Sequence, residues 1–125
     1  MKIFLVDSNI LIDVLRGDAQ AAAFVDFIDQ VHISVVTAAE ILVGSRNKAE
    51  MEINSELLNR CEIIYPDTRE LDLALDTIKN NNPRDGIEFD DALIAASAIS
   101  QGMTLATRDG RHFKNIERLK IYAPY

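Results

Sequence analysis

Short apolar runs alternate with segments of helical periodicity along most of this 125-residue chain. The run KIFLV at 2–6 is continuous, which is typical of a strand buried on both faces of a sheet. HISVV is short and β-branched, a second strand-like pattern. On these criteria strands are predicted at 2–6, 32–36, 61–65, 103–107 and 119–123.

Apolar residues recur at helical spacing between these runs. Ile10, Leu11 and Val14 follow this spacing before Gly17, a residue that commonly ends a helix. In the segment 68–80 the apolar stripe consists of Leu71, Leu75 and Ile78. Helices are therefore predicted at 8–15, 19–30, 37–44, 47–60, 68–80 and 90–101, with a loop at 80–86.

Strands that alternate with helices predict an α/β fold in one domain spanning 1–125, with a mainly parallel sheet covered by helices on both faces. In such sheets, ligands bind beyond the carboxyl ends of the strands, near a switch in strand order. The residues that directly follow the predicted strands are therefore the first place to look for a site.

Four acidic residues lie where such a site is expected: Asp7, Glu40, Asp91 and Asp109. No basic residue directly accompanies the first three. If the fold brings them together, their charges would be hard to sustain without a divalent cation. The pattern therefore indicates a metal-dependent phosphoryl-transfer site.

Each acid also has a structural explanation. Asp7 precedes a predicted helix and could cap it, although Ser8 could do so instead. Thr37 and Glu40 match a capping box, in which each side chain binds the other's backbone N–H. Asp109 precedes glycine, as in many ordinary turns.

Asp90 and Asp91 open one predicted helix, and acids favour that end of a helix. With Asp90 as the cap, Asp91 lies in the first turn. The spacing alone does not decide which of the two faces the site.

Composition narrows the function classes. The net charge of −7 argues against a protein that simply coats DNA. The segment 105–125 is nevertheless basic, with five Lys or Arg residues against two acids. The single Cys61 cannot form an intramolecular disulfide, and no run of 18 apolar residues or export signal is present. We expect a cytoplasmic protein without a membrane span.

Other chemistries lack their motifs. His32 and His112 have no ligand-spaced partner for zinc, and the chain contains no GxGxxG, Walker A or GxSxG sequence.

Taken together, four segments resemble the PIN-domain family, and specifically its VapC type of toxin ribonuclease from toxin–antitoxin pairs. The matching segments are VDSNILI at 6–12, SVVTAAEI at 34–41, DALIAA at 91–96, and LATRD at 105–109 followed by Phe113. They occur in the family's order over essentially the whole chain.

The resemblance implies a three-layer α/β/α sandwich and a Mg²⁺ or Mn²⁺ ion held by the four acids. It selects Asp91 over Asp90, because the family's acid directly precedes the run ALIAA. Ser8 matches the hydroxyl residue that accompanies the first aspartate. Relatives often carry another acid three residues after the last one, where this chain has His112.

By the same resemblance, the substrate is RNA, cut by water to leave a 5′-phosphate and a 3′-hydroxyl. A cognate antitoxin would block the acidic pocket, and the protein would be a homodimer. From charge and position, Arg84, Arg108 and Arg111 could grip flanking phosphates.

Two other classes are compatible with an acidic pocket. A phospho-signalling receiver domain would need an accepting aspartate, for which Asp67 is available, and a lysine after a late strand, which is missing after 103–107. A non-catalytic module could use the same acids only to bind basic side chains.

Overall fold

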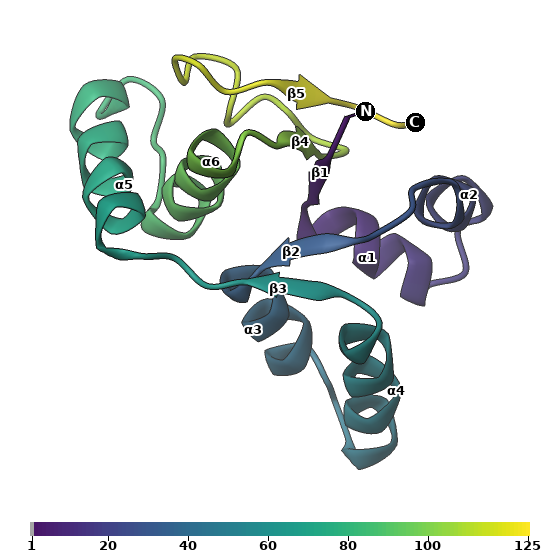
Figure 1. The fold of residues 1–125 in the computed structure, drawn as a ribbon. Helices are drawn as coiled ribbons and strands as arrows, with labels where there is room; N and C mark the ends of the chain where they lie inside the picture. The colour runs from purple at the N-terminus through teal and green to yellow at the C-terminus, as the bar shows by residue number, and fades with distance from the viewer. Residues whose placement is uncertain (1) are drawn as a thin grey trace.

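The computed structural model describes residues 2–125 (Figure 1), which form five strands and six helices. The strands are β1 (Phe4–Val6), β2 (His32–Ser34), β3 (Glu62–Ile64), β4 (Thr104–Ala106) and β5 (Ile121–Tyr122). The helices are α1 (Ser8–Leu15), α2 (Ala19–Phe27), α3 (Val35–Val43), α4 (Lys48–Asn59), α5 (Thr68–Asn81) and α6 (Phe89–Gln101).

The strands form one sheet in the order β3-β2-β1-β4-β5, and every neighbouring pair is parallel. From β1 the chain adds β2 and β3 on one side, then returns to place β4 and β5 on the other side. The switch in strand order therefore lies between β1 and β4, at the carboxyl ends of both strands.

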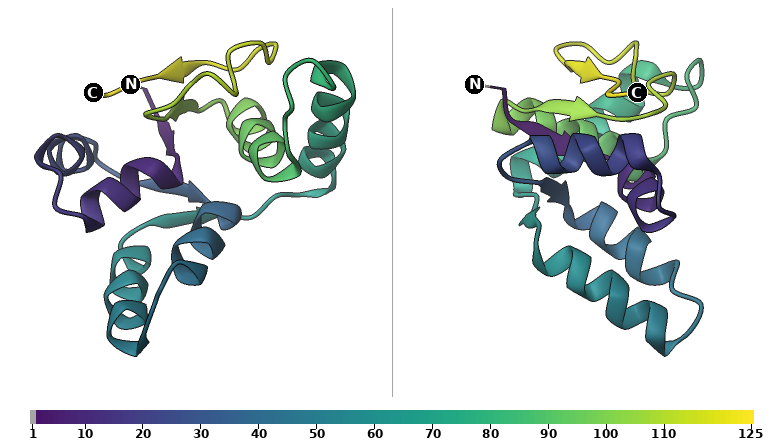
Figure 2. Two further views of the ribbon diagram at one scale, coloured as in Figure 1. Left: turned by 180° about the vertical axis from the view of Figure 1, so that it is seen from behind. Right: turned by 90° about the vertical axis from the view of Figure 1, so that its right-hand side faces the viewer.

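Helices cover both faces of the sheet, which confirms the three-layer α/β/α prediction (Figures 1 and 2). Alternate strand residues supply two separate cores. Leu5 and Leu105 pack on the face covered by α5 and α6. Val6 and Ala106 pack on the opposite face, with apolar residues of α1, α2, α3 and α4. The pleat of each strand thus contributes to both layers.

Several predicted boundaries differ from the structure. The strand expected at 119–123 is only Ile121–Tyr122. The strand expected at 32–36 ends at Ser34, and Val35 and Val36 already belong to α3. The hydroxyl of Ser34 accepts a hydrogen bond from the Val36 amide at 3.1 Å, and a serine in this role starts a helix despite the β-branched residues that follow. The helix expected at 19–30 ends at Phe27.

The apolar stripe predicted for α5 is also wrong in part. Leu71 and Leu75 are exposed, whereas Glu70, Ala74 and Thr77 are buried. The helix α5 packs along α6, whose buried face is rich in alanine. Small side chains allow two helices to approach closely, so Ala74 of α5 lies in the core that α6 lines, while Leu71 and Leu75 lie in solvent.

No helix within residues 2–125 is long and apolar enough to cross a membrane.

Candidate active site

Asp7 lies at the centre of the carboxyl edge, between β1 and α1. One carboxylate oxygen, Oδ1, accepts a hydrogen bond from the Ser8 amide at 2.8 Å and caps α1. The other oxygen, Oδ2, accepts a hydrogen bond from the hydroxyl of Thr107 at 2.8 Å. Burial raises the pKa of Asp7, and the hydrogen bonds from Thr107 and Ser8 partly offset this effect.

Glu40 lies in the middle of α3, and the capping box predicted for it does not form. Ser34 is the N-cap residue of α3, and Thr37 is buried inside the helix. The Glu40 side chain is therefore not committed to capping. The pKa of Glu40 is raised by partial burial of its carboxylate and then by the negative charges of Asp7, Asp90 and Asp91.

Asp91 lies in the first turn of α6, whose N-terminus is at the same edge of the sheet. Glu88 occupies the N-cap position without a side-chain hydrogen bond, so the prediction that Asp90 caps this helix is wrong. Asp90 is exposed and Asp91 is half-buried. Burial raises the pKa of Asp91, the charge of Asp7 raises it further, and the charge of His112 lowers it.

Three carboxylates from β1, α3 and α6 thus act on one another. Asp7 contributes to the raised pKa of both Glu40 and Asp91. In residues 2–125, none of the three forms an ion pair. Such a cluster holds negative charge unfavourably and attracts cations.

Asp109 has a different environment. Its carboxylate receives the guanidinium of Arg111 at both oxygens, at 3.0 and 3.1 Å, and also the Arg111 amide. The guanidinium lowers the pKa of Asp109 to about 2. Asp109 is near enough to Asp7 to raise that residue's pKa slightly, so it lies at the margin of the cluster.

The residues predicted to contact substrate lie in different places. Ser8 is beside Asp7, to which it donates its amide. Arg108 pairs with buried Asp13 of α1 at 3.4 Å. The same Asp13 oxygen accepts a hydrogen bond from Tyr125 at 2.7 Å.

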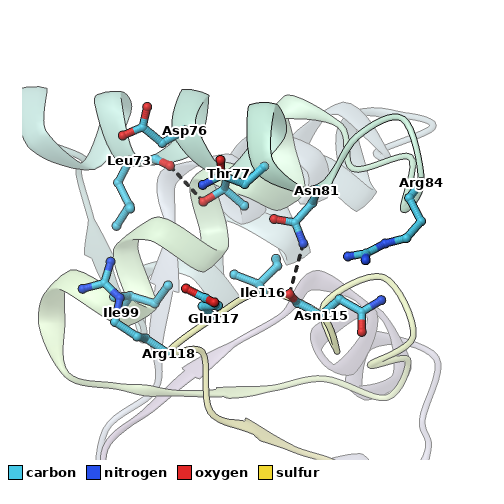
Figure 3. Close-up of a pocket in the computed structure, with 11 residues that line it drawn as sticks. Leu73, Asp76, Thr77, Asn81, Arg84, Ile99, Asn115, Ile116, Glu117 and Arg118 are labelled. Atoms are coloured by element: carbon cyan, nitrogen blue, oxygen red, sulfur yellow. Dashed lines mark hydrogen bonds between the residues drawn. The ribbon is translucent and has the colours of Figure 1, made fainter.

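Arg84 pairs with Asp85 and lines a cavity of about 260 Å³ between α5 and the segment 115–118 (Figure 3). In this cavity Asn81 donates a hydrogen bond to the backbone oxygen of Asn115. None of the four predicted acids lines this cavity.

Two polar residues of the site were missed in the sequence, Asn9 and Thr107. The side chain of Asn9 donates to the hydroxyl of Thr107 at 3.1 Å, across 98 residues of sequence. Thr107 is fully buried and directly follows the apolar residues of β4. A threonine that continues a buried strand and precedes a candidate acid was the available signal.

The donor set suits a hard divalent cation, because carboxylate oxygens are the ligands that Mg²⁺ prefers and Mg²⁺ keeps several waters. Within residues 2–125, no three Asp, Glu, His or Cys side chains are grouped closely enough to hold an ion as they stand. The carboxylates of Asp7, Glu40 and Asp91 nevertheless have the charge and chemistry that such an ion would compensate.

Comparison with known proteins gives a family and several structural relatives. A family model described as PIN domain matches residues 4–119. A chain from a toxin–antitoxin complex of Klebsiella pneumoniae is 24% identical in sequence. The match covers 99% of this chain and 98% of that chain, with a TM-score of 0.83.

VapBC2 from Rickettsia felis, bound to a promoter DNA fragment, is 23% identical over 96% of this chain and 97% of its own, with a TM-score of 0.81. DNA-bound VapBC from Salmonella typhimurium is 22% identical over the full length of both chains, with a TM-score of 0.80. A search of the curated proteins found no match. At these identities the solved structures establish a shared fold.

Proposed function

The chain belongs to the PIN domain family, and from that premise we propose that it is a metal-dependent endoribonuclease of the VapC toxin type, acting in the cytoplasm. The observation that carries this proposal is the cluster of Asp7, Glu40 and Asp91 at the switch in strand order. These three carboxylates come from distant parts of the sequence, and the charge of Asp7 raises the pKa of both Glu40 and Asp91.

Asp7, Glu40 and Asp91 would hold Mg²⁺ or Mn²⁺, with Asp109 at the margin of the set. When bound, such an ion lowers the pKa of water and offsets charge that develops on phosphate oxygens. The hydrogen bonds from Ser8 and Thr107 orient Asp7 before substrate arrives.

The reaction is hydrolysis of an RNA phosphodiester. The oxygen of water attacks phosphorus, the bond to the 3′-oxygen breaks, and that oxygen leaves as a hydroxyl. A proton from the attacking water ends on the departing 3′-oxygen. Because the bond to the 3′-oxygen is the one that breaks, the products carry a 5′-phosphate and a 3′-hydroxyl, and no 2′,3′-cyclic phosphate forms because the ribose 2′-hydroxyl takes no part.

Arginines beside the acids suit the binding of flanking phosphates. The guanidinium of Arg108 is half-exposed while Asp13 holds it in place, and that of Arg111 is largely exposed beside Asp109. Arg84 would bind phosphate at the separate cavity of Figure 3, beyond the acids.

We further propose a cognate antitoxin as partner, on the evidence of a groove between α1, α3 and α4. Ile12, Leu15, Ile41 and Ile53 supply apolar surface, and Glu40 of the acidic cluster lies on the same groove. An amphipathic segment could bind these apolar residues and direct a basic side chain to the acids. A small gene immediately upstream that encodes such a segment would support this partner. A homodimer is proposed by analogy with the family.

A receiver-like function is less well supported. Asp67 follows β3, which is an edge strand, and its carboxylate caps α5 through the Glu70 amide at 2.9 Å. It lies outside the switch in strand order.

The decisive experiment is cleavage of RNA by purified protein with Mg²⁺ or Mn²⁺. We expect Asp7→Asn and Asp91→Asn each to lower the rate by about a hundredfold or more, because each removes a carboxylate charge that would hold the ion against the reacting phosphate. Asp90→Asn is the matched control. It removes the same charge from the same helical turn at an exposed position, and activity should stay within a few fold of the native rate.

Products are checked for 5′-phosphate ends by a 5′-phosphate-dependent exonuclease. Undiminished cleavage by Asp7→Asn or Asp91→Asn would reject the assigned site. Cleavage that leaves 2′,3′-cyclic phosphate would reject the hydrolytic mechanism.

A further inference from the structure

The hydroxyl of Thr107 has four polar neighbours at the centre of the site. The side-chain nitrogen of Asn9 lies 3.1 Å from it, and the Asp109 amide nitrogen lies 3.2 Å from it. Its other neighbours are Oδ2 of Asp7 at 2.8 Å and the backbone oxygen of Asp109 at 3.3 Å. Because Thr107 is fully buried, water does not alter this set.

The donors and acceptors around this hydroxyl determine where its proton points. A hydroxyl has two lone pairs and one proton. The two N–H groups occupy both lone pairs, so the proton must go to one of the two oxygens. The bond to the Asp7 carboxylate is shorter and charge-assisted, and it is therefore the stronger choice.

The orientation of the Asn9 amide is fixed independently. Its oxygen accepts a hydrogen bond from the Arg108 backbone amide at 3.2 Å. A backbone N–H can only donate, so the amide oxygen must face Arg108, and the NH₂ group must then face Thr107. If the Asn9 amide were turned over, its oxygen and nitrogen would exchange places and both hydrogen bonds would be lost.

We propose that Asn9 is a positioning residue that occupies one lone pair of the Thr107 hydroxyl and so holds this hydroxyl in place as the donor to Asp7. This inference rests on the proposed function and adds Asn9 to its site. Each Asp7 oxygen then has one protein donor, the Ser8 amide at Oδ1 and the Thr107 hydroxyl at Oδ2. The carboxylate is held with its remaining lone pairs available to a cation. With both lone pairs occupied, the Thr107 hydroxyl itself does not coordinate the ion.

The test is a double-mutant cycle with Mn²⁺ binding as the readout, measured by calorimetry without RNA. Asn9→Ala and Thr107→Val should each weaken Mn²⁺ binding about three- to tenfold, the range that one ordinary hydrogen bond provides. Because Asn9 acts through Thr107, the double variant should bind Mn²⁺ no more weakly than Thr107→Val alone. Thr107→Ser keeps the hydroxyl and should retain nearly native affinity.

Additive effects of Asn9→Ala and Thr107→Val would overturn the proposal, and so would native Mn²⁺ affinity in either variant. Asp7→Asn separates this inference from the proposed function. If Asp7→Asn loses Mn²⁺ binding while Asn9→Ala keeps it, only the role of Asn9 is rejected. If Asp7→Asn binds Mn²⁺ normally, the metal site itself is rejected. Far-ultraviolet circular dichroism at the assay temperature confirms that each variant is folded.

Discussion

At the scale of single residues, Asp7 combines two roles that the sequence presented as alternatives. One oxygen caps α1 while the other accepts from Thr107, so the carboxylate is a helix cap and a member of the acidic cluster together. The cap fixes the carboxylate at the carboxyl end of β1. An aspartate that ends a central strand and starts a helix is therefore well oriented for binding at the sheet edge.

The four acids stood out in the sequence because each lies beside an apolar segment of regular pattern. Asn9 and Thr107 were not, because their hydrogen bond joins residues 98 positions apart. Local patterns report what a side chain can do for its own helix or strand. They do not report which distant loop will face it. The ion pair between Asp109 and Arg111 is local in sequence. It was still not predictable, because an Asp-Gly pair indicates a turn of the backbone and says nothing about the direction of a nearby arginine side chain.

The raised pKa values of the cluster predict an unusual dependence of stability on pH. Burial raises the pKa of Asp7, Glu40 and Asp91 above their ordinary values of 3.8 and 4.5, and the charge of a neighbouring acid raises each of them further. A raised pKa contributes stability that is fully present below the ordinary value and is lost as pH rises through the raised value. The acidic cluster should therefore contribute less to the melting temperature of the metal-free protein at pH 7 than at pH 4.5, near the ordinary values of these carboxyls.

Asp7→Asn should raise the melting temperature of the metal-free protein at pH 7 by a few degrees and flatten its change between pH 4.5 and 7. Differential scanning calorimetry in the presence of a chelator measures both. Asp72→Asn, at an exposed position on α5, controls for net charge. Asp109 does not contribute to this change in melting temperature. Because its pKa is lowered, it alters the stability only at pH values below its ordinary pKa of 3.8. An equal gain in both variants would show that overall charge, and not the cluster, is responsible.

At the scale of secondary-structure elements, the start of α3 shows how two valid local signals can compete. Thr37 and Glu40 have capping-box spacing, but Ser34 also has a good capping side chain and lies where β2 ends. The strand ends earlier than its β-branched pattern suggested, and the helix includes Thr37 in its interior. This shift frees Glu40 for the site.

Replacing Ser34 and Thr37 should therefore have unequal effects on stability. Ser34→Ala removes the hydroxyl that caps α3 and should lower the free energy of unfolding by about 1 kcal/mol. The Thr37 hydroxyl is buried and has no hydrogen-bond partner among residues 2–125, so Thr37→Val, which keeps the shape, should be neutral or slightly stabilising.

Urea denaturation measures both changes. If Thr37→Val proved to be the more destabilising change, Thr37 would have to be the cap, contrary to the structure. Equal losses in both variants would show that the hydroxyl of Thr37 has a partner.

At the scale of the whole molecule, the alternation of strands and helices was sufficient to predict a parallel sheet with two helical layers. The strand order was not readable, because nothing in the local pattern states which strands become neighbours. The order matters for function, since it places β1 beside β4 and so brings Asp7 to Thr107. The buried face of α5 was likewise decided by α6 rather than by its own apolar stripe.

The groove between α1 and the α3–α4 pair provides the last prediction, which concerns the proposed antitoxin. Ile53 of α4 is 57% exposed and lines this groove. If an amphipathic segment of the antitoxin binds there, Ile53→Glu places a charge against its apolar face. We expect a loss of about 2 kcal/mol, roughly thirtyfold in Kd, because an apolar contact is replaced by a charge that must be desolvated.

Phe27→Glu is the matched control, since Phe27 is 86% exposed on α2 and does not line the groove. Both variants should cleave RNA at the native rate, because neither residue belongs to the acidic cluster. Calorimetric titration with the antitoxin purified from the neighbouring gene gives Kd, and inhibition of cleavage gives the functional consequence. If the antitoxin inhibits Ile53→Glu as strongly as the native protein, it binds somewhere other than the groove. If only Phe27→Glu loses affinity for the antitoxin, its binding site lies on α2. Either result would leave the carboxylate site intact while removing the groove as the route by which a partner reaches it.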